Sequence, residues 1–196
     1  MKERLCKAAF EQIRDHGYVN FRTAAVTRLA GVSQGAYMHH FPTKSDLALA
    51  TMEYAYEEAT ATSLSRIQHT PADSDPISAL VEDARHFFFS AHFRVVLDIL
   101  MCGGNDEALR QQLVAITVKY RSKIERAWLE KLVDHGWSLS AAEDVLAMTF
   151  SLARGFAMRL LVEPDPAPFD AMMERWKKIA CAQKGTTHGF HQDPAS

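Results

Sequence analysis

The chain has 196 residues, of which 47% are apolar, so it can bury a substantial core as one large domain or as a small module joined to a larger one. Its net charge of −2 is not in itself a sign of a nucleic-acid partner. Residues 1–50 nevertheless carry a net charge of +3, from seven basic and four acidic residues, while the remainder carries −5. This asymmetry is compatible with a basic N-terminal domain followed by an acidic domain.

The three cysteines stand too far apart in the sequence to suggest a disulfide framework or a metal site, which is typical of a protein of the reducing cytosol. They are Cys6, Cys102 and Cys181. The N-terminus turns polar within a few residues, unlike a signal peptide. The most apolar long stretch, 145–162, is interrupted by two arginines and is interpreted as a buried helix. A soluble, cytoplasmic protein that does not insert into a membrane is therefore expected.

Helical periodicity dominates the chain, and strand signals such as alternation with period two are nearly absent. A segment rich in Pro, Asp and Ser, 69–76, separates the first four expected helices from about five more. In chain order, the expected helices cover about 2–16, 23–30, 34–40, 44–67, a segment after Pro76, 93–101, 106–135, 140–163 and 169–183.

Residues that favour helix ends mark several of these boundaries, since Gly suits the end of a helix and Ser or Thr suits its start. The expected C-terminal signals are Gly17 and Gly136, and the expected N-caps are Ser33, Thr43 (with Asp46 completing a capping box) and Ser140.

The segments 23–30 and 34–40, joined by a Gly-Val-Ser turn at 31–33, match a helix-turn-helix in length and pattern. Isolated helices this short are marginal in water, so they need neighbours to hold them. The apolar contacts expected to do so are those of Val26, Leu29, Ala30 and Val32. The second helix of such a pair fits the major groove of B-DNA, where its first residues reach the base edges.

Short helix pairs with a glycine turn also occur in all-α domains of other functions, and the bare pattern leaves that alternative open. In the DNA-binding interpretation, Ser, Gln and Tyr hydrogen-bond to bases or phosphates, Gly and Ala permit close approach, and Thr and Lys contact the flanking backbone. The residues expected to contact DNA are Thr23, Arg28, Ser33, Gln34, Gly35, Ala36, Tyr37, His39, His40 and Lys44.

The stretch AGVSQGAYMHHFPTKSDL resembles the signature of the TetR family of transcriptional repressors, in which a Gly-Val-Ser turn is followed by Gly, a Leu-Tyr pair, His-Phe and a Lys. The positions that fall on this pattern are Gly31, Val32, Ser33, Gly35, His40, Phe41, Lys44 and Leu47. The chain departs from the pattern at Tyr37-Met38, where the family has Leu-Tyr, and at Thr27, where alanine is usual. The first departure displaces by one position a tyrosine that commonly touches a phosphate in that family.

The resemblance implies an all-α fold of about nine helices. It implies an N-terminal helix-turn-helix DNA-binding domain in residues 1–48, a helical effector-binding and dimerisation domain in 49–183, and a disordered tail in 184–196. It further implies a transcriptional repressor that binds a palindromic operator in double-stranded DNA as a homodimer and is released by a small molecule. The chain is not expected to be an enzyme, and no catalytic residue, metal or cofactor is expected.

Small-molecule sites are usually apolar cavities with few polar groups, so a hydrophobic or aromatic effector is expected. Arg154 stands out, because a charge within an apolar helix needs an internal acid, a contact across a dimer or an anionic ligand. The candidate pocket residues are His86, Phe89, Phe93, Met101, Tyr120, Arg121, Trp128 and Arg154. Packing in an ordinary core is the alternative for most of them.

The segments 140–163 and 169–183 are expected to form a four-helix interface with a second subunit, because the first is apolar around much of its circumference. The candidate interface residues are Thr149, Leu152, Phe156, Leu160, Met173 and Trp176. The alternative, in which one chain fills both faces, stays open. A symmetric dimer also suits a single helix-turn-helix, which gains specificity from two half-sites.

Two other functions are compatible with parts of the sequence. Glu82, Asp83 and His86 lie within one helical turn, as in a carboxylate-bridged metalloenzyme, but such a site needs a second Glu-x-x-His helix, and the sequence has no second copy. A DNA-binding protein of the same fold that takes no small molecule is the other alternative.

Overall fold

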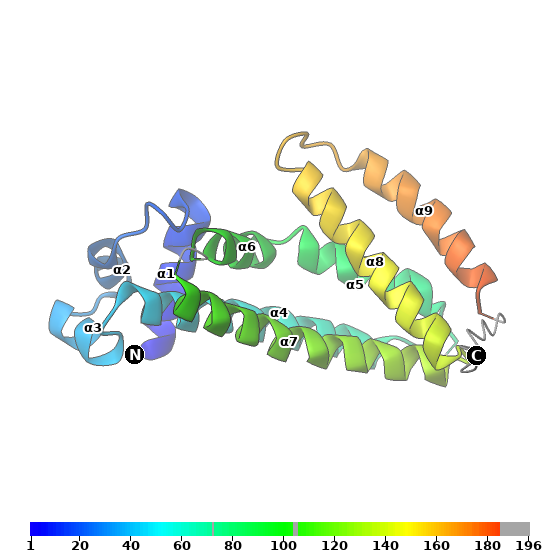
Figure 1. Ribbon diagram of the computed structural model, residues 1–196, viewed down its shortest axis with the longest axis horizontal. Coiled ribbons are helices and arrows are strands. Elements are labelled where there is room, and N and C mark those ends of the chain that lie inside the picture. The colour runs from blue at the N-terminus through cyan, green and yellow to red at the C-terminus, as the bar shows by residue number, and fades with distance from the viewer. Residues whose placement is uncertain (72, 104–105, 185–196) are drawn as a thin grey trace, which may run out of the picture. The chain divides into compact units, whose positions relative to one another are not determined.

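The computed structural model describes residues 1–71, 73–103 and 106–184, and in these ranges the chain folds into nine helices and no strand (Figure 1). The all-α class predicted from the sequence is confirmed. The helices are α1 (Lys2–His16), α2 (Thr23–Ala30), α3 (Gln34–His40), α4 (Lys44–His69), α5 (Pro76–Phe88), α6 (Ala91–Gly103), α7 (Glu107–Asp134), α8 (Leu139–Arg159) and α9 (Ala167–Ala182). The predicted disordered tail lies outside the described residues from 185 onward.

Two predicted caps at the N-terminal end of the chain are confirmed. The Ser33 hydroxyl accepts a hydrogen bond from the Ala36 amide, and it is the N-cap of α3. Thr43 and Asp46 form a reciprocal capping box, in which the Thr43 amide donates to the Asp46 carboxylate and the Asp46 amide donates to the Thr43 hydroxyl. These contacts satisfy amides that the first turn of a helix leaves without partners.

The prediction that Ser140 caps α8 is wrong. The cap is Ser138, whose hydroxyl accepts from the Ala141 amide, and α8 ends at Arg159 rather than at residue 163. The two serines are two residues apart, and the sequence pattern alone does not distinguish them.

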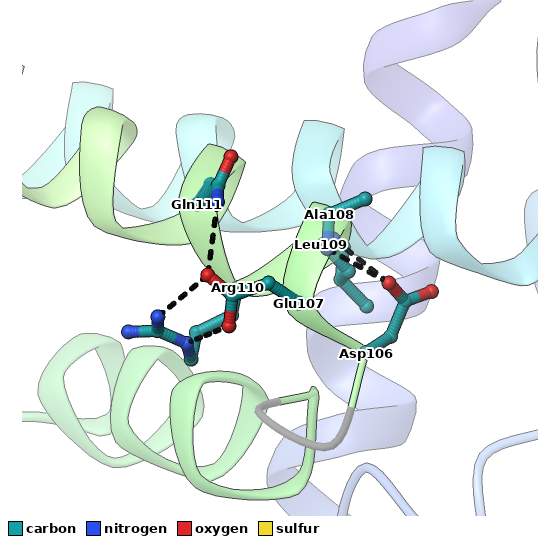
Figure 2. Close-up of polar contacts among 6 residues, drawn as sticks. All are labelled: Asp106, Glu107, Ala108, Leu109, Arg110 and Gln111. Carbon is teal, nitrogen blue, oxygen red and sulfur yellow. Dashed lines mark hydrogen bonds and ion pairs between the residues drawn. The ribbon is translucent and has the colours of Figure 1, made fainter.

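The start of α7 is fixed by its own first residues (Figure 2). The Asp106 carboxylate accepts hydrogen bonds from the amides of Ala108 and Leu109 at 3.0 and 3.2 Å. The Glu107 carboxylate pairs with the Arg110 guanidinium, which lies about one turn further along α7, at 2.7 Å (Figure 2). Acidic groups at this end also suit the partial positive charge of a helix N-terminus.

The chain divides into two compact units, which do not coincide with contiguous halves of the sequence. Unit 1 comprises Met1–Leu64 and Phe89–Ile124, and unit 2 comprises residues 65–88 and 125–184 of the described chain. The helices α4 and α7 contribute residues to both. The sequence-based division at residue 48 concerns function rather than packing, and it stays a prediction.

In unit 1, α1 packs against α2 and α6, and α2 packs against α3. The buried face of α1 includes Leu5, Ala9, Phe10 and Ile13, as the helical periodicity predicts. Burial in this core raises the pKa of the Cys6 thiol to about 11, so the side chain behaves as a small apolar group. Two short helices are thus held by a longer one.

In unit 2, α5 packs against α8 and α9, and α8 and α9 run side by side in opposite directions (Figure 1). Two buried polar contacts fix this core. The Trp128 indole N–H donates to the Asp83 carboxylate at 2.9 Å, and the Trp176 indole N–H donates to the Thr149 hydroxyl at 2.8 Å. Buried polar groups need such partners, so the contacts specify one arrangement of these helices.

Within the described ranges, no helix taken singly has both the length and the apolar composition to cross a membrane, and only α5 and α6 taken together reach that composition.

Candidate nucleic-acid interface

The turn between α2 and α3 is closed by backbone contacts and by a side chain from α1. Gly31 adopts the left-handed conformation, with φ of 63° and ψ of 42°, which favours glycine. The Val32 amide donates to the Thr27 carbonyl at 3.0 Å. The Arg4 guanidinium donates to the carbonyls of Ala30 and Gly31 at the end of α2. A cation therefore supports the negative end of α2 and holds the turn in place.

One stripe along α3 faces away from the protein. Its exposed side chains include Gln34, Met38 and His39, and Gly35 lies on the same side. A methyl group added at Gly35 would meet no atom of the protein within 4 Å. The stripe therefore combines hydrogen-bonding side chains with a place where an outside molecule can approach the backbone.

The pair at which the sequence departs from the family signature takes two different positions. Tyr37 is buried, with 2% of its surface exposed, and its hydroxyl lies 3.5 Å from the Thr43 carbonyl. Burial, together with the nearby Asp46 carboxylate, raises the pKa of the Tyr37 phenol. Met38 is 47% exposed. Tyr37 thus occupies the interior position of the pair and Met38 the outward one.

Lys44, at the start of α4, contacts the loop between α1 and α2. Its ammonium donates to the Tyr18 carbonyl at 3.2 Å and lies 5.0 and 4.4 Å from the ring centres of Tyr18 and Phe21. Burial, with a contribution from the Arg22 charge, lowers the pKa of Lys44. A phosphate contact by Lys44 stays a prediction, and in this structure the ammonium joins α4 to the loop.

The same residue of the loop, Tyr18, is also held from α6. The Tyr18 amide donates to one carboxylate oxygen of Asp98 at 2.5 Å, and the Cys102 thiol donates to the other at 3.4 Å. Sequence reasoning did not identify Asp98 or Arg4. Both act on backbone atoms that are distant in the sequence, so no local pattern marks them.

The other predicted DNA-contacting residues surround the stripe. Arg28 is exposed on α2, and Thr23 is partly exposed at its start. Ala36 and His40 are partly buried on α3, and the ring of His40 lies 5.3 Å from that of His39. Partial desolvation and the neighbouring His39 lower the pKa of His40. Leu29, predicted to pack inside, is instead 51% exposed, because the apolar face of α2 is narrower than expected.

The candidate effector residues of unit 1 include both core and surface side chains. Phe93 is buried, whereas Met101 is 73% exposed. Tyr120 stacks on Tyr56 with ring centres 5.4 Å apart and donates to the Glu57 carboxylate at 2.9 Å. The remaining two are Phe89, which is partly buried, and Arg121, which is exposed.

Unit 2 contains the other three effector candidates. Trp128 is fully buried against Asp83, whereas His86 is exposed. Arg154 was expected to need an internal acid, a contact across a dimer or an anionic ligand, and a contact with a second subunit or a ligand stays a prediction. Its side chain is exposed, and its guanidinium lies over the Phe88 ring at 5.4 Å. A guanidinium in this position keeps its hydration and gains a cation–π contact.

An open cavity of about 850 Å³ lies in unit 2, and none of the predicted effector residues lines it. It is bounded by residues 73–76, by the end of α7 and the turn after it, and by Cys181 and Lys184. Three aspartates and two lysines are among its lining residues, so the lining carries no dominant charge.

Three of the six predicted dimer residues pack inside the chain. Thr149, Met173 and Trp176 are buried between α8 and α9, where Trp176 donates to Thr149. They are therefore not available to a second subunit, and this part of the prediction is corrected. The other three, which are partly exposed, are Leu152, Phe156 and Leu160.

The metalloenzyme alternative finds no support in the part of the chain that the structure describes. No group of three or more His, Cys, Asp or Glu side chains is placed there to hold a metal ion. Asp83 points into the core toward Trp128, while Glu82 and His86 are exposed. The three residues lie within one helical turn, but their side chains point in different directions.

Known proteins similar to this chain are regulators of transcription. The sequence profile of bacterial regulatory proteins of the tetR family matches residues 5–51. The HTH-type transcriptional regulator CymR of Pseudomonas putida is 38% identical over 177 residues, which make up 90% of this chain and 87% of that protein.

Solved structures share the fold at low sequence identity. A TetR transcriptional regulator from Legionella pneumophila has a TM-score of 0.67 at 17% identity, covering 91% of this chain and 96% of that one. The regulator FadR from Bacillus subtilis, in complex with stearoyl-CoA, has a TM-score of 0.62 at 14% identity, covering 94% and 98%. These relatives are regulators and not enzymes. The chain is a DNA-binding transcriptional regulator and belongs to the tetR family of bacterial regulatory proteins.

Proposed function

We propose that this regulator is a cytoplasmic repressor that binds a palindromic operator as a homodimer and leaves it when a hydrophobic or aromatic small molecule binds. The observation that carries the proposal is the exposed stripe of α3, which presents Gln34 and His39 beside an open backbone at Gly35. Such a surface suits the edges of bases in a major groove. Repression rather than activation follows the family resemblance.

A single α3 offers few contacts, since it has seven residues and only part of its surface is exposed. Each well-made base contact contributes about 1–3 kcal/mol of discrimination. Two copies that read two half-sites roughly double that discrimination, and a two-fold symmetric protein reads a palindrome. The proposal of a dimer follows from this requirement.

The surface of α8 and α9 supplies a candidate interface. Met148, Gly155 and Met158 on α8 are all exposed and lie seven and three residues apart, so they fall on one face of the helix and form one stripe. On α9, Met172 and Ile179 are exposed in the same way. Apolar stripes on two adjacent helices are the usual form of a four-helix interface.

Gly155 gives independent support for this interface. It lies in the interior of α8, where glycine costs about 1 kcal/mol relative to alanine. A methyl group at this position would meet no atom of the chain within 4 Å, so the packing of this chain does not require glycine there. A closely approaching helix of a second subunit would require it.

Release by a small molecule is supported by the fold and by a neighbour. The similar structure of FadR from Bacillus subtilis contains stearoyl-CoA, a ligand with a long apolar chain. The aromatic side chains of unit 2, including Phe88, Phe150 and Trp128, give this chain an apolar interior of the kind that takes such groups.

Selection from random DNA tests the operator. Purified protein is incubated with a pool of random duplexes, and the bound duplexes are sequenced and then measured by mobility shift. We expect an inverted repeat whose half-sites lie about one helical turn or more apart. We also expect the affinity to fall steeply with salt, because lysines and arginines displace counterions from phosphates.

Gln34→Ala provides the matched test of the reading surface. It should change the preferred base at one position per half-site by about 1–3 kcal/mol. Gln112→Ala, which removes an exposed glutamine on α7, is the control and should leave the preference unchanged. Equal retention of random and selected DNA, or an unchanged preference in Gln34→Ala, contradicts the assignment.

Release is tested on the selected operator with a panel of small aromatic and aliphatic compounds. A compound that raises the melting temperature of the protein should also abolish the mobility shift. A panel that changes neither measurement favours the alternative of a DNA-binding protein of this fold without a small-molecule ligand.

A further inference from the structure

Met38 is placed unusually for an apolar side chain. It is 47% exposed, and it lies on the outward stripe of α3 between side chains that hydrogen-bond. A single exposed apolar residue on a protein surface needs no explanation. This one is four residues from Gln34 and three from Gly35, so it borders both on the same face of the helix.

Tyr37 does not compete with Met38 for this face. Its ring is turned inward, where only 2% of the residue is exposed, and its hydroxyl lies against the Thr43 carbonyl. The outward position next to Gln34 therefore carries a thioether and no hydroxyl. A thioether donates no hydrogen bond, so Met38 offers nothing that a phosphate oxygen requires.

Gly35 gives this face its shape. Its φ is not positive, unlike the φ of Gly17, Gly31 and Gly136. The backbone therefore does not require glycine at 35, and a methyl group there would meet nothing of the protein. With no side chain at 35, the helix surface beside Met38 is open to an approaching molecule.

The major groove of B-DNA displays only one apolar group, the C5-methyl of thymine, and apolar side chains contact it. We propose that Met38, beside the open surface at Gly35, packs against the C5-methyl group of a thymine in each half-site, next to the base that Gln34 reads. This inference rests on the proposed operator binding. It makes Met38 a specificity-determining residue that discriminates by burying a methyl group rather than by hydrogen bonding.

Deoxyuridine differs from thymine only by the missing methyl group, so it tests the proposal directly. The probe is the duplex recovered by selection from random DNA, with each thymine of one half-site replaced in turn by deoxyuridine. We expect one position at which the replacement weakens binding about fourfold, as for the loss of one buried methyl group, and about fifteenfold when both half-sites are replaced.

The variants Met38→Ala and Met38→Leu separate the contact from a general loss of fit. Met38→Ala should bind the thymine and deoxyuridine duplexes with nearly equal affinity. Met38→Leu, which keeps an apolar side chain of similar size, should retain most of the difference. The control is Val118→Ala on α7, since Val118 is 45% exposed, and it should behave as the unaltered protein.

The outcomes also separate this inference from the proposed function. If no duplex is selected over random DNA, the operator proposal fails. If a duplex is selected but deoxyuridine has no effect at any position, or has the same effect in Met38→Ala as in the unaltered protein, Met38 does not read a thymine methyl. If Met38→Ala weakens all duplexes equally, the side chain contacts the sugar–phosphate backbone, and the inference is overturned.

Discussion

Asp98 is the residue by which α6 holds the loop that follows α1. Its carboxylate accepts the Tyr18 amide and the Cys102 thiol, and one of its oxygens would lie 3.5 Å from a methyl group placed on Gly17. Gly17 has a φ of 78°, so the loop reaches Asp98 through a turn that favours glycine. A side chain of α6 thereby fixes the loop that leads into α2.

Replacing Asp98 with alanine should release that loop. The Tyr18 amide would lose its acceptor, and leaving such a donor partly buried without a partner costs about 1–3 kcal/mol. We expect a lower free energy of unfolding in urea and faster hydrogen exchange at the Tyr18 amide. Asp144→Ala, an exposed acid on α8, is the control and should change neither. Unchanged exchange at Tyr18 in Asp98→Ala contradicts this role.

Glu58 makes part of the stability of the protein depend on pH. Burial alone would raise the pKa of its carboxyl, but hydrogen bonds from Tyr54 at 2.7 Å and from His92 at 3.1 Å outweigh burial and lower it below 4.5. A carboxyl whose pKa is lowered by folding stabilises the folded state above its unfolded pKa. That contribution is lost as the pH falls through the folded pKa.

Glu58→Gln should therefore be less stable than the unaltered protein at neutral pH, and the difference should shrink as the pH falls below 4.5, the ordinary pKa of a glutamate. Thermal unfolding followed across this range measures it. Glu143→Gln, which alters an exposed glutamate on α8, serves as the comparison. A difference that stays constant with pH would show that the Glu58 charge does not contribute.

At the scale of elements, the two glycines next to and within α3, Gly31 and Gly35, have different explanations. Gly31 needs its left-handed conformation, and a methyl group on it would lie 3.2 Å from the Arg4 guanidinium. Gly35 has ordinary helical geometry and open space. The first glycine is required by the fold, and we attribute the second to the DNA.

The matched pair Gly31→Ala and Gly35→Ala tests this distinction. Gly31→Ala should lower the free energy of unfolding by about 1–2 kcal/mol, the cost of a left-handed residue with a side chain. Gly35→Ala should raise it by up to about 1 kcal/mol, because alanine is the better helix former. In mobility shifts, Gly35→Ala should nevertheless bind the operator more weakly. Tighter binding by the stabilised variant would contradict the close approach of DNA at this position.

The ends of most helices could be predicted from the sequence, because caps are local. Ser33 and the Thr43–Asp46 box lie within three residues of the amides they satisfy, and α1, α2 and α3 have the predicted bounds. The burial of Tyr37 and the exposure of Met38 were not predictable from the sequence, because they depend on which of the two side chains fits against Thr43. The contacts of Arg4 and Asp98 join residues 26 and 80 positions apart, and periodicity carries no information at that range.

The outward placement of Gln34 and His39 was predictable from a known pattern, whereas their contact with DNA stays a prediction. Side-chain placement was less predictable for α8 and α9, where both faces are apolar. The helical pattern marks Thr149 and Trp176 as apolar-face residues but cannot state whether a neighbour in the same chain or a second subunit covers them. In the structure, the neighbour is in the same chain.

At the scale of the whole molecule, assembly should depend on the exposed stripe of α8. A charge placed in an apolar interface is costly because it loses water without gaining a partner. Met158→Lys should therefore shift the protein from dimer to monomer, measured by light scattering on a sizing column, and weaken operator binding. Val133→Lys is the control, since Val133 is also exposed in unit 2 but lies on α7. A monomeric unaltered protein, or a dimeric Met158→Lys, would place the interface elsewhere.

The two hydrogen bonds to the main chain of Tyr18 have a consequence for how this protein and its relatives diverge in sequence. Both of its polar contacts, from Asp98 and Lys44, are made to main-chain atoms of residue 18. Most substitutions at this position leave those atoms in place, whereas proline would delete the N–H. The two polar contacts therefore persist when the side chain at 18 changes, whereas the contact of the Lys44 ammonium with the ring requires an aromatic residue there. In an alignment, positions 98 and 44 should be conserved, and position 18 should vary among aromatic residues.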